Sequence, residues 1–420
     1  MDLTTAEARE LLGAVGARPP GPADPEIDGL TPSLVLEPSS VEAAGRALAF
    51  CQQERLAVVP LGAGTRLHLG NLPSRLDVYL STRGLAGVFD YEPGDLTVSA
   101  GAGTTLRELQ AVVGAERQFL PWDVPLAHRA TVGGILAAGD PGFRRRPGAR
   151  PRDLLLGAEA VCADGTRVKA GGRVVKNVAG YEVTKLLVGS LGTLGLLTRV
   201  HLRLRPRPEA TQTLAACFPD GAEIDRAVRA LRTAAVDPEV LAAANPSVAA
   251  EVGLSGWAVL MRFEGREEEV RAGAARAKEL IRAGETEPLT EVQSEKAWET
   301  LYDFPSPEGR TIHRRVLRVQ ALPSEALSLA QRFPQDCLLL AFPDAGLVFV
   351  RLDEREHCQQ IAAQAAERGA NVVLEAVPAD WKSEVDVFGE PPGGFALMRA
   401  IKNKLDPRGI LAPGRFVGRL

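Results

Sequence analysis

The chain has 420 residues and a formal net charge of −4, with 45% hydrophobic and 24% charged residues. This composition is close to the globular average and excludes wholesale disorder, collagen-like repeats and coiled coils. The lack of net positive charge and an aromatic content of 5% argue against a nucleic-acid-binding protein.

The first segment, residues 1–26, is expected to hold a short helix and a lead-in, because Thr4 and Glu7 have capping-box spacing. No signal-peptide pattern and no run of about 18 uncharged apolar residues occurs. The five cysteines are scattered and include no C-x-x-C pair. We therefore expect reduced thiols, no metal, no iron–sulfur cluster, and a cytoplasmic protein that reaches a membrane only through partners.

Residues 27–207 are predicted to form a first domain rich in short strands. Thr105 and Glu108 form a capping box, and Asp164-Gly165 is a hairpin turn between two strands. The predicted elements are helices over 39–54 and 105–113 and strands over 56–59, 78–80, 88–91, 96–100, 154–162, 167–169 and 196–204.

Residues 208–392 are predicted to form a second, smaller α+β domain, an antiparallel sheet covered by helices. The predicted strands are 211–218, 240–244, 257–263, 311–320, 336–342, 346–351 and 371–375, and the helices are 220–234, 265–283, 323–333 and 353–368. The last stretch, residues 393–420, is a helix and a Pro/Gly-rich tail that is expected to return to the first domain.

Three loops of small residues carry the first chemical signal. One follows strand 56–59 and consists of Pro60, Leu61, Gly62, Ala63, Gly64, Thr65 and Arg66. Its backbone N–H groups can converge on an anion such as a pyrophosphate, although an ordinary strand-to-strand turn would have the same composition. Leu67 occupies the place of the third glycine of a Rossmann fingerprint, so the loop is not of that kind.

The second loop runs over residues 131–139 and follows Pro121-Trp122-Asp123, and the third runs over 176–181 and leads into 187–198. Three such segments within about 140 residues predict a long, flat ligand threaded between backbone segments. A dinucleotide fits that description.

These segments resemble the FAD-binding domain of the vanillyl-alcohol oxidase / p-cresol methylhydroxylase superfamily. Residues 60–66 are similar to its pyrophosphate loop, Thr131-Val132-Gly133-Gly134 to its T-x-G-G segment, and residues 189–198 to its G-S-x-G-T-L-G-x-x-T signature. The tail over 405–415 resembles the closing D-P-x-G-I-L-N-P-G-K/R, with Ala412 in the usual Asn place. The resemblance implies a two-subdomain FAD-binding domain followed by an α+β cap domain.

A narrower resemblance joins the chain to the smaller of the two FAD-binding subunits of glycolate oxidase (glycolate dehydrogenase). Residues 172–181 are similar to its G-G-x-V-x-K-N-V-A-G-Y-D, with Glu182 in place of the Asp. The resemblance implies a complex with a larger catalytic flavin subunit and an iron–sulfur subunit, and non-covalent FAD.

The resemblance also implies a set of cofactor-binding residues. They are Pro60, Gly62, Ala63, Gly64, Thr65, Arg66, Trp122, Thr131, Val132, Gly133, Gly134, Lys176, Asn177, Gly180, Tyr181, Gly195 and Leu196. Lys176 can stabilise negative charge on the flavin or be a surface lysine, and Tyr181 can contact the isoalloxazine or pack in the core. The run from Arg144 to Arg146 is either a solvated loop or a surface for phosphates or an acidic partner.

The second domain departs from the family at its catalytic motif. Active 2-hydroxy-acid dehydrogenases of the family carry an H-x-G-x-G-N type segment, and residues 343–347 hold no histidine. The catalytic residues are therefore unknown. Arg318, on a predicted strand, falls in a segment that resembles the W-R-L-S-L-P pattern of the glycolate oxidase subunit and is either a substrate-binding residue or an exposed strand residue. We expect a subunit that takes part in oxidising glycolate to glyoxylate and passes electrons to an iron–sulfur partner. A self-sufficient 2-hydroxy-acid dehydrogenase and a non-catalytic scaffold with structural FAD remain open.

Overall fold

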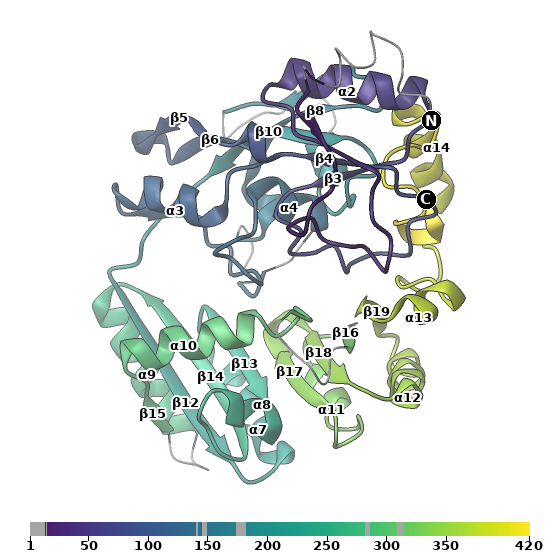
Figure 1. Ribbon diagram of the computed structural model, residues 1–420. Helices are drawn as coiled ribbons and strands as arrows, with labels where there is room; N and C mark the ends of the chain where they lie inside the picture. The colour runs from purple at the N-terminus through teal and green to yellow at the C-terminus, as the bar shows by residue number, and fades with distance from the viewer. Residues whose placement is uncertain are drawn as a thin grey trace. The chain divides into compact units, whose positions relative to one another are not determined.

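The computed structural model describes residues 13, 15–139, 142–144, 149–173, 182–281, 286–308 and 315–420. The chain divides into two compact units (Figure 1). Unit 1 comprises Met1–Gly142, Pro147–Pro206 and Pro378–Leu420, and unit 2 comprises Phe143–Arg146 and Arg207–Val377. The return to unit 1 therefore comes at Pro378, earlier than the expected position after residue 392.

A four-stranded sheet begins unit 1. Its order is β1 (Ala17–Arg18), β2 (Leu34–Leu36), β4 (Val78–Ser81) and β3 (Val58–Leu61). Strands β2, β4 and β3 are parallel, and all residues of β4 are buried, as expected of a central parallel strand. Helix α2 (Val41–Gln53) packs its alanine-rich face into the core beside this sheet and is capped by Ser40, whose hydroxyl accepts from the N–H of Ala43.

The second sheet of unit 1 is antiparallel and five-stranded. Its order is β5 (Val88–Glu92), β6 (Thr97–Gly101), β10 (Leu196–Arg203), β8 (Leu155–Val161) and β9 (Arg167–Gly171). Helices α3 (Leu106–Gly114) and α4 (Val132–Ala138) pack on it around a core that includes Trp122. Short elements complete the unit: β7 (Gln118–Phe119), α5 (Pro151–Leu154), α6 (Thr184–Leu187), β11 (Arg205–Pro206), α13 (Ala379–Glu384) and α14 (Phe395–Leu405).

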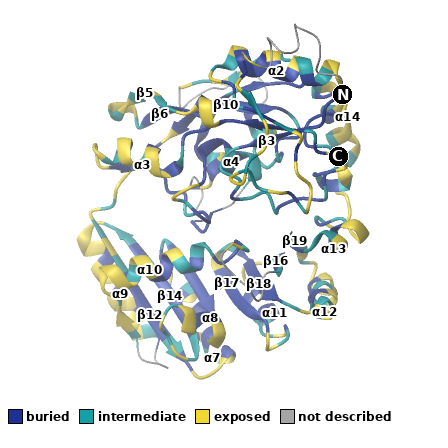
Figure 2. Cartoon of the chain, in the orientation of Figure 1, coloured by how far each residue is buried: buried dark blue, intermediate teal, exposed yellow. Residues whose placement is uncertain are grey.

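Unit 2 is built on one eight-stranded antiparallel sheet. Its order is β15 (Thr286–Pro288), β12 (Ala210–Phe218), β14 (Trp257–Gly265), β13 (Val240–Ala244), β17 (Leu338–Phe342), β18 (Leu347–Leu352), β16 (Arg315–Gln320) and β19 (Asn371–Ala376). Consecutive residues of β13 and β17 are all buried, so both faces of the sheet are covered (Figure 2). The helices are α7 (Gly221–Thr233), α8 (Pro246–Glu251), α9 (Glu267–Leu280), α10 (Glu291–Tyr302), α11 (Ala326–Ala330) and α12 (Arg355–Ala366).

The segment Phe143–Arg146 contributes two side chains to the interior of unit 2. Phe143 stacks on Tyr302 with ring centroids 4.9 Å apart, inside an aromatic cluster on α10 and the sheet. The Arg144 guanidinium is buried and forms a two-point ion pair with the Glu264 carboxylate, one of its hydrogen bonds being 2.8 Å long. The solvated loop considered for Arg144 is therefore wrong, because the side chain has a buried carboxylate partner.

The predicted fold class is confirmed, with a two-sheet first unit and a second unit whose sheet is antiparallel. None of the helices in the described part of the chain combines the length and the apolar character that a membrane crossing requires.

Candidate functional site

A cleft in unit 1 lies where three chain segments meet. The loop after β3, over residues 59–67, forms one wall, and Thr131 with α4 forms another. Leu191, Gly192 and Arg415 complete the lining. Residues that are far apart in the sequence thus come together around one concave surface, and Pro60, Gly62, Ala63, Gly64, Thr65, Arg66, Thr131 and Gly134 of the predicted set all line it.

Small residues are required where the loop after β3 meets α4. A Cβ at Gly62 would collide with the Oγ1 of Thr131, which is already used to cap α4 by accepting from the Gly134 N–H at 3.2 Å. Gly64 has φ +77°, in the left-handed region that favours glycine. The loop therefore presents backbone, rather than side chains, to the cleft.

A buried cation closes the far side of the cleft. Arg415 is 2% exposed, and its Nη2 donates to the carbonyl oxygens of Leu67, at 2.7 Å, and of Leu69. Its Nε has no hydrogen-bond partner, and within the described residues no carboxylate lies within ion-pair distance of its guanidinium. Burial lowers the pKa of Arg415, the effect that desolvation has on a cation, and the Asp28 carboxylate offsets only part of it.

The charge near Arg415 is positive overall. Lys382 of α13 is fully buried, and its Nζ lies 2.9 Å from the Asp28 carboxylate and donates to the His68 carbonyl at 2.8 Å. Burial lowers the pKa of Lys382, and the Asp28 carboxylate opposes that shift. Asp28 also acts on Arg415 through space, so two buried cations share one carboxylate. An anion in the cleft would supply the missing negative charge.

A second buried ion pair holds the rest of the lining in place. Lys402 of α14 donates to the Asp406 carboxylate at 2.6 Å and to the carbonyls of Thr193 and Leu411, each at 2.8 Å. Leu411 in turn forms a parallel bridge with Val58 of β3. The tail that carries Arg415 and the loop that carries Leu191 and Gly192 are thus fixed to the same strand.

Other predicted residues lie outside the lining. Val132 is fully buried in the core, Gly133 packs against Ala102, and Leu196 is 1% exposed in the core beside α2. Gly195 faces the Val161 carbonyl of β8, where a Cβ would be 3.1 Å from that oxygen. Trp122 is buried in the core against α3 and α4, and its indole N–H has no hydrogen-bond acceptor. Lys176, Asn177, Gly180 and Tyr181 lie outside the described residues.

The sequence analysis missed Arg415, Leu191 and Gly192 as site residues. Leu191 and Gly192 fall inside the motif from which Gly195 and Leu196 were chosen, and Arg415 ends the closing motif of the tail. Both motifs therefore contained these residues, but a sequence motif does not show which of its residues face the ligand.

In unit 2 the predicted substrate residue is already paired. Arg318 of β16 is half-buried and forms a hydrogen-bonded ion pair with Glu375 of β19, which is 2% exposed. The segment Pro343–Ala345 is a short 3-10 turn that joins β17 to β18, with Gly346 at φ +64°. It forms a turn and holds no histidine, and its one carboxylate, Asp344, is ion-paired with Arg232 at 2.9 Å.

The cleft has the properties that FAD requires. Small residues line the cleft, and the buried guanidinium of Arg415, which lies among the lining residues, could meet the diphosphate, for which arginine is well suited. The Gly loop, Thr131, Gly192 and Arg415 are the residues that would hold the cofactor.

Comparison with known proteins bears on this assignment. Residues 32–171 match the family described as FAD binding domain, and residues 389–416 match the C-terminal domain of FAD linked oxidases. Glycolate oxidase subunit GlcD of Bacillus subtilis is 26% identical over 94% of this chain and 91% of that protein. Glycolate oxidase subunit GlcE of Escherichia coli is 38% identical over 32% of this chain and 39% of that protein.

The fold is also found among solved structures. The crystal structure of p-cresol methylhydroxylase with substrate bound has a TM-score of 0.71 at 18% identity, covering 97% of this chain and 95% of that one. FAD as the cofactor and an FAD-dependent oxidoreductase as the class of protein, both predicted from the sequence, are confirmed by these matches.

Proposed function

We propose that this chain, whose residues 32–171 and 389–416 match an FAD binding domain and the C-terminal domain of FAD linked oxidases, takes part in oxidising a small 2-hydroxy acid, such as glycolate to glyoxylate. The observation that carries the proposal is the glycine-lined cleft with its buried Arg415, which shares one carboxylate with Lys382, in a chain similar to a glycolate oxidase subunit over 94% of its length. FAD, when bound, supplies a two-electron acceptor for the C–H bond of the carbinol carbon.

The residues of this chain bind and orient the cofactor. Arg415 neutralises the diphosphate, and the loop over residues 62–66 donates backbone hydrogen bonds to it. The Lys402–Asp406 pair keeps the tail and the loop that holds Gly192 in position. These contacts are made by rigid elements, so the cofactor is held without reorganisation of the site.

This chain offers fewer groups for proton transfer from the substrate than for binding the cofactor. A 2-hydroxy acid needs a cation for its carboxylate and a base for its hydroxyl proton. Arg318 is the candidate for the carboxylate, and Glu375 must release it or share it. The segment over residues 343–347 holds no histidine and its Asp344 is ion-paired with Arg232, so we propose that a larger flavin subunit supplies the efficient catalysis.

Two subunit identities fit the comparisons differently. GlcD aligns along nearly the whole chain, whereas GlcE has the higher identity over a shorter stretch. We favour a role like that of GlcE, as the smaller FAD-binding subunit, because residues 172–181 follow its motif and the second unit lacks the histidine motif. Electrons then leave through a partner iron–sulfur subunit. A self-sufficient dehydrogenase and a scaffold with structural FAD are the alternatives.

Anaerobic stopped-flow mixing distinguishes these three roles. We expect the flavin absorption band of the lone chain to bleach very slowly with glycolate or D-lactate, since a positioned base typically contributes about 10²–10⁴-fold in rate. Photoreduction of the same sample should bleach the band and serves as the control for a reducible flavin. Adding the partner subunits should restore turnover.

Each alternative has its own outcome. Rapid bleaching of the lone chain by any 2-hydroxy acid would establish the self-sufficient dehydrogenase and end our proposal. A photoreduced flavin that never passes electrons to the partner subunits would establish the scaffold.

A further inference from the structure

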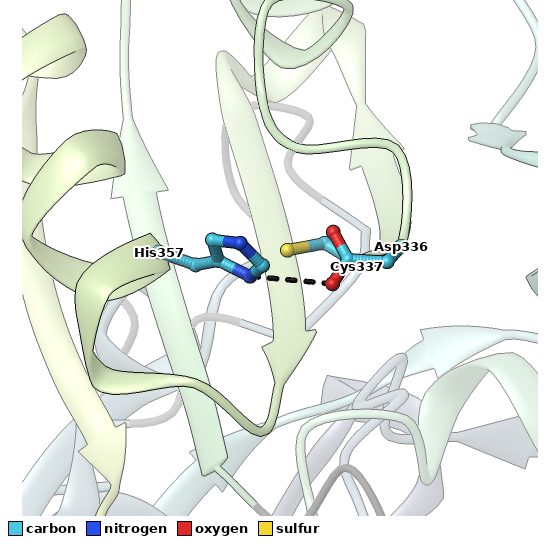
Figure 3. A group of neighbouring side chains, drawn as sticks. All are labelled: Asp336, Cys337 and His357. Atoms are coloured by element: carbon cyan, nitrogen blue, oxygen red, sulfur yellow. Dashed lines mark ion pairs between the residues drawn. The ribbon is translucent and has the colours of Figure 1, made fainter.

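Three potential metal ligands meet in unit 2, away from the cleft described above. Asp336 and Cys337 immediately precede β17, and His357 lies in the first turn of α12. An oxygen of Asp336, the Sγ of Cys337 and a ring nitrogen of His357 all lie within 4.8 Å of one another. Figure 3 shows the thiol and the carboxylate directed toward the imidazole ring.

The spacing of the donor atoms fits a tetrahedral ion. The Nδ1 of His357 lies 3.4 Å from the Oδ2 of Asp336. For bonds of about 2.0–2.2 Å to nitrogen and oxygen, two tetrahedral ligands are separated by about 3.4 Å. The nitrogen and oxygen are therefore already at ligand–ligand distance, and the thiol lies within 4.8 Å of both.

The backbone that carries the thiol is held firmly. The Cys337 carbonyl accepts from the Nδ2 of buried Asn245 at 2.8 Å, and the Cys337 N–H donates to the Pro334 carbonyl at 3.2 Å. The Oδ1 of the same Asn245 accepts from the Leu339 N–H at 3.2 Å. On the other side, Ile361 of α12 is fully buried and anchors the helix that presents His357. The start of β17 and helix α12 therefore hold the ligands in place before a metal binds.

One side of the cluster is open. Cys337 is 1% exposed, whereas the side chains of His357 and Asp336 are 25% and 65% exposed. An ion can enter past the carboxylate, and a water molecule can complete its coordination from the solvent side.

We propose that Asp336, Cys337 and His357 bind a zinc ion, with water as the fourth ligand, that links the start of β17 to α12. The choice of metal follows from the donors, because a thiolate with an imidazole suits zinc and disfavours magnesium and calcium. Binding displaces the thiol proton to solvent and leaves the metal in the Zn²⁺ state, so no redox partner is required.

This site is distinct from the place of the family's histidine motif. The segment nearest to that motif is residues 343–347, at the junction of β17 and β18 and at the far end of β17 from Cys337. The five residues of β17 separate the two positions by roughly 17 Å of extended chain. The sequence prediction of no metal rested on the missing C-x-x-C pattern, and ligands 20 residues apart have no such signature.

The test uses the full chain, freed of any affinity tag, reduced, and treated with a chelator before zinc is added. We expect one zinc per chain by elemental analysis after gel filtration. Zinc K-edge absorption fine structure should show one sulfur at about 2.3 Å and nitrogen or oxygen neighbours at about 2.0–2.1 Å. This method reports the ligands without interference from the flavin.

Two conservative variants, Asp336→Asn at an exposed position and His357→Gln at a half-buried one, each remove one ligand with little change to packing, and Cys337→Ser removes the sulfur. Changing a residue that only hydrogen-bonds to a metal ligand weakens metal binding by roughly 10–100-fold. Losing a ligand itself should therefore weaken zinc binding by more than about 100-fold. Cys217→Ser and His128→Ala change the same residue types outside the cluster and should bind zinc like the unaltered chain. Flavin content should be equal in all of them.

The proposal would be overturned by a chain that retains no zinc after gel filtration. Equal zinc affinity in Asp336→Asn, His357→Gln and the unaltered chain would overturn it as well. An absorption spectrum without a sulfur neighbour would exclude Cys337 as a ligand and have the same consequence.

Discussion

Replacing Arg415 with methionine isolates the charge that the cleft offers to an anion. The substitution keeps an unbranched side chain of similar length and removes the guanidinium, whose Nε has no partner in the protein. A charge-assisted hydrogen bond contributes about 1.5–3 kcal/mol, which corresponds to about 10- to 150-fold in affinity. We therefore expect Arg415→Met to bind FAD about 10- to 150-fold more weakly than the unaltered chain.

The same change removes two donors from the protein interior. The carbonyls of Leu67 and Leu69 lose the Nη2 of Arg415, at a cost of about 1–3 kcal/mol for each buried acceptor left unpaired. The loss of an uncompensated buried charge offsets part of this cost. The free energy of unfolding of the cofactor-free chain must therefore be measured beside the affinity.

Arg408→Met is the matched control for this experiment. Arg408 lies on the same tail and also donates to two carbonyls, those of Gln52 and Gln53, but it is exposed and lies outside the cleft. Titration of the cofactor-free proteins with FAD, followed by flavin fluorescence, gives the affinities. If Arg415→Met stays folded and binds FAD as tightly as Arg408→Met, the assignment of the diphosphate to Arg415 is wrong.

Three further predictions concern the cofactor and the acid stability of unit 1. Acid precipitation should release all FAD into the supernatant, and yellow colour in the pellet would instead indicate a covalent bond. Gly64→Val should weaken FAD binding by about 100-fold or more, because backbone contacts to the cofactor are lost. The control, Gly29→Val, has a similar φ of +83° with open space around it and should bind FAD normally. Equal titration curves for the two variants would refute the loop assignment. Hydrogen bonding from Arg18 lowers the pKa of Asp24 from 3.8 to about 2, so this carboxylate stabilises the fold by about 2 kcal/mol above pH 4. That contribution is lost as the pH falls toward 2, and acid denaturation of Asp24→Asn, monitored by circular dichroism, should lack it.

The sequence predicted correctly those helices and strands that depend on short-range patterns of residues. The strand over 240–244 is observed with the same bounds, and the capping box of Thr105 and Glu108 begins α3 as expected. Helix α10 was missed although Thr290 and Gln293 form a capping box, because its weak amphipathic pattern gave no periodic signal. Where a pattern is strong and local, the sequence is sufficient.

Contacts between distant segments could not be predicted in the same way. The loop at Gly62 was identified from its composition, but the approach of Arg415, more than 350 residues later, depends on the bridge between Val58 and Leu411. Asp336 and His357 meet only because β17 and α12 are brought together in unit 2. Such pairs are set by tertiary packing, for which a single sequence carries no periodic or spacing signal.

The bridge between Leu411 and Val58 also bears on how the protein is made. During synthesis the strand at Val58, the loop at Gly62 and the carbonyls of Leu67 and Leu69 leave the ribosome early, whereas Arg415, which donates to those carbonyls, follows about 350 residues later. Domains tend to fold as they emerge, N-terminal parts first. Unit 1 therefore cannot complete its fold, and the edge of β3 stays unpaired, until all of unit 2 has been translated. Loading of the cofactor is then an event that follows translation of unit 2, and products that end before Arg415 lack a finished cleft.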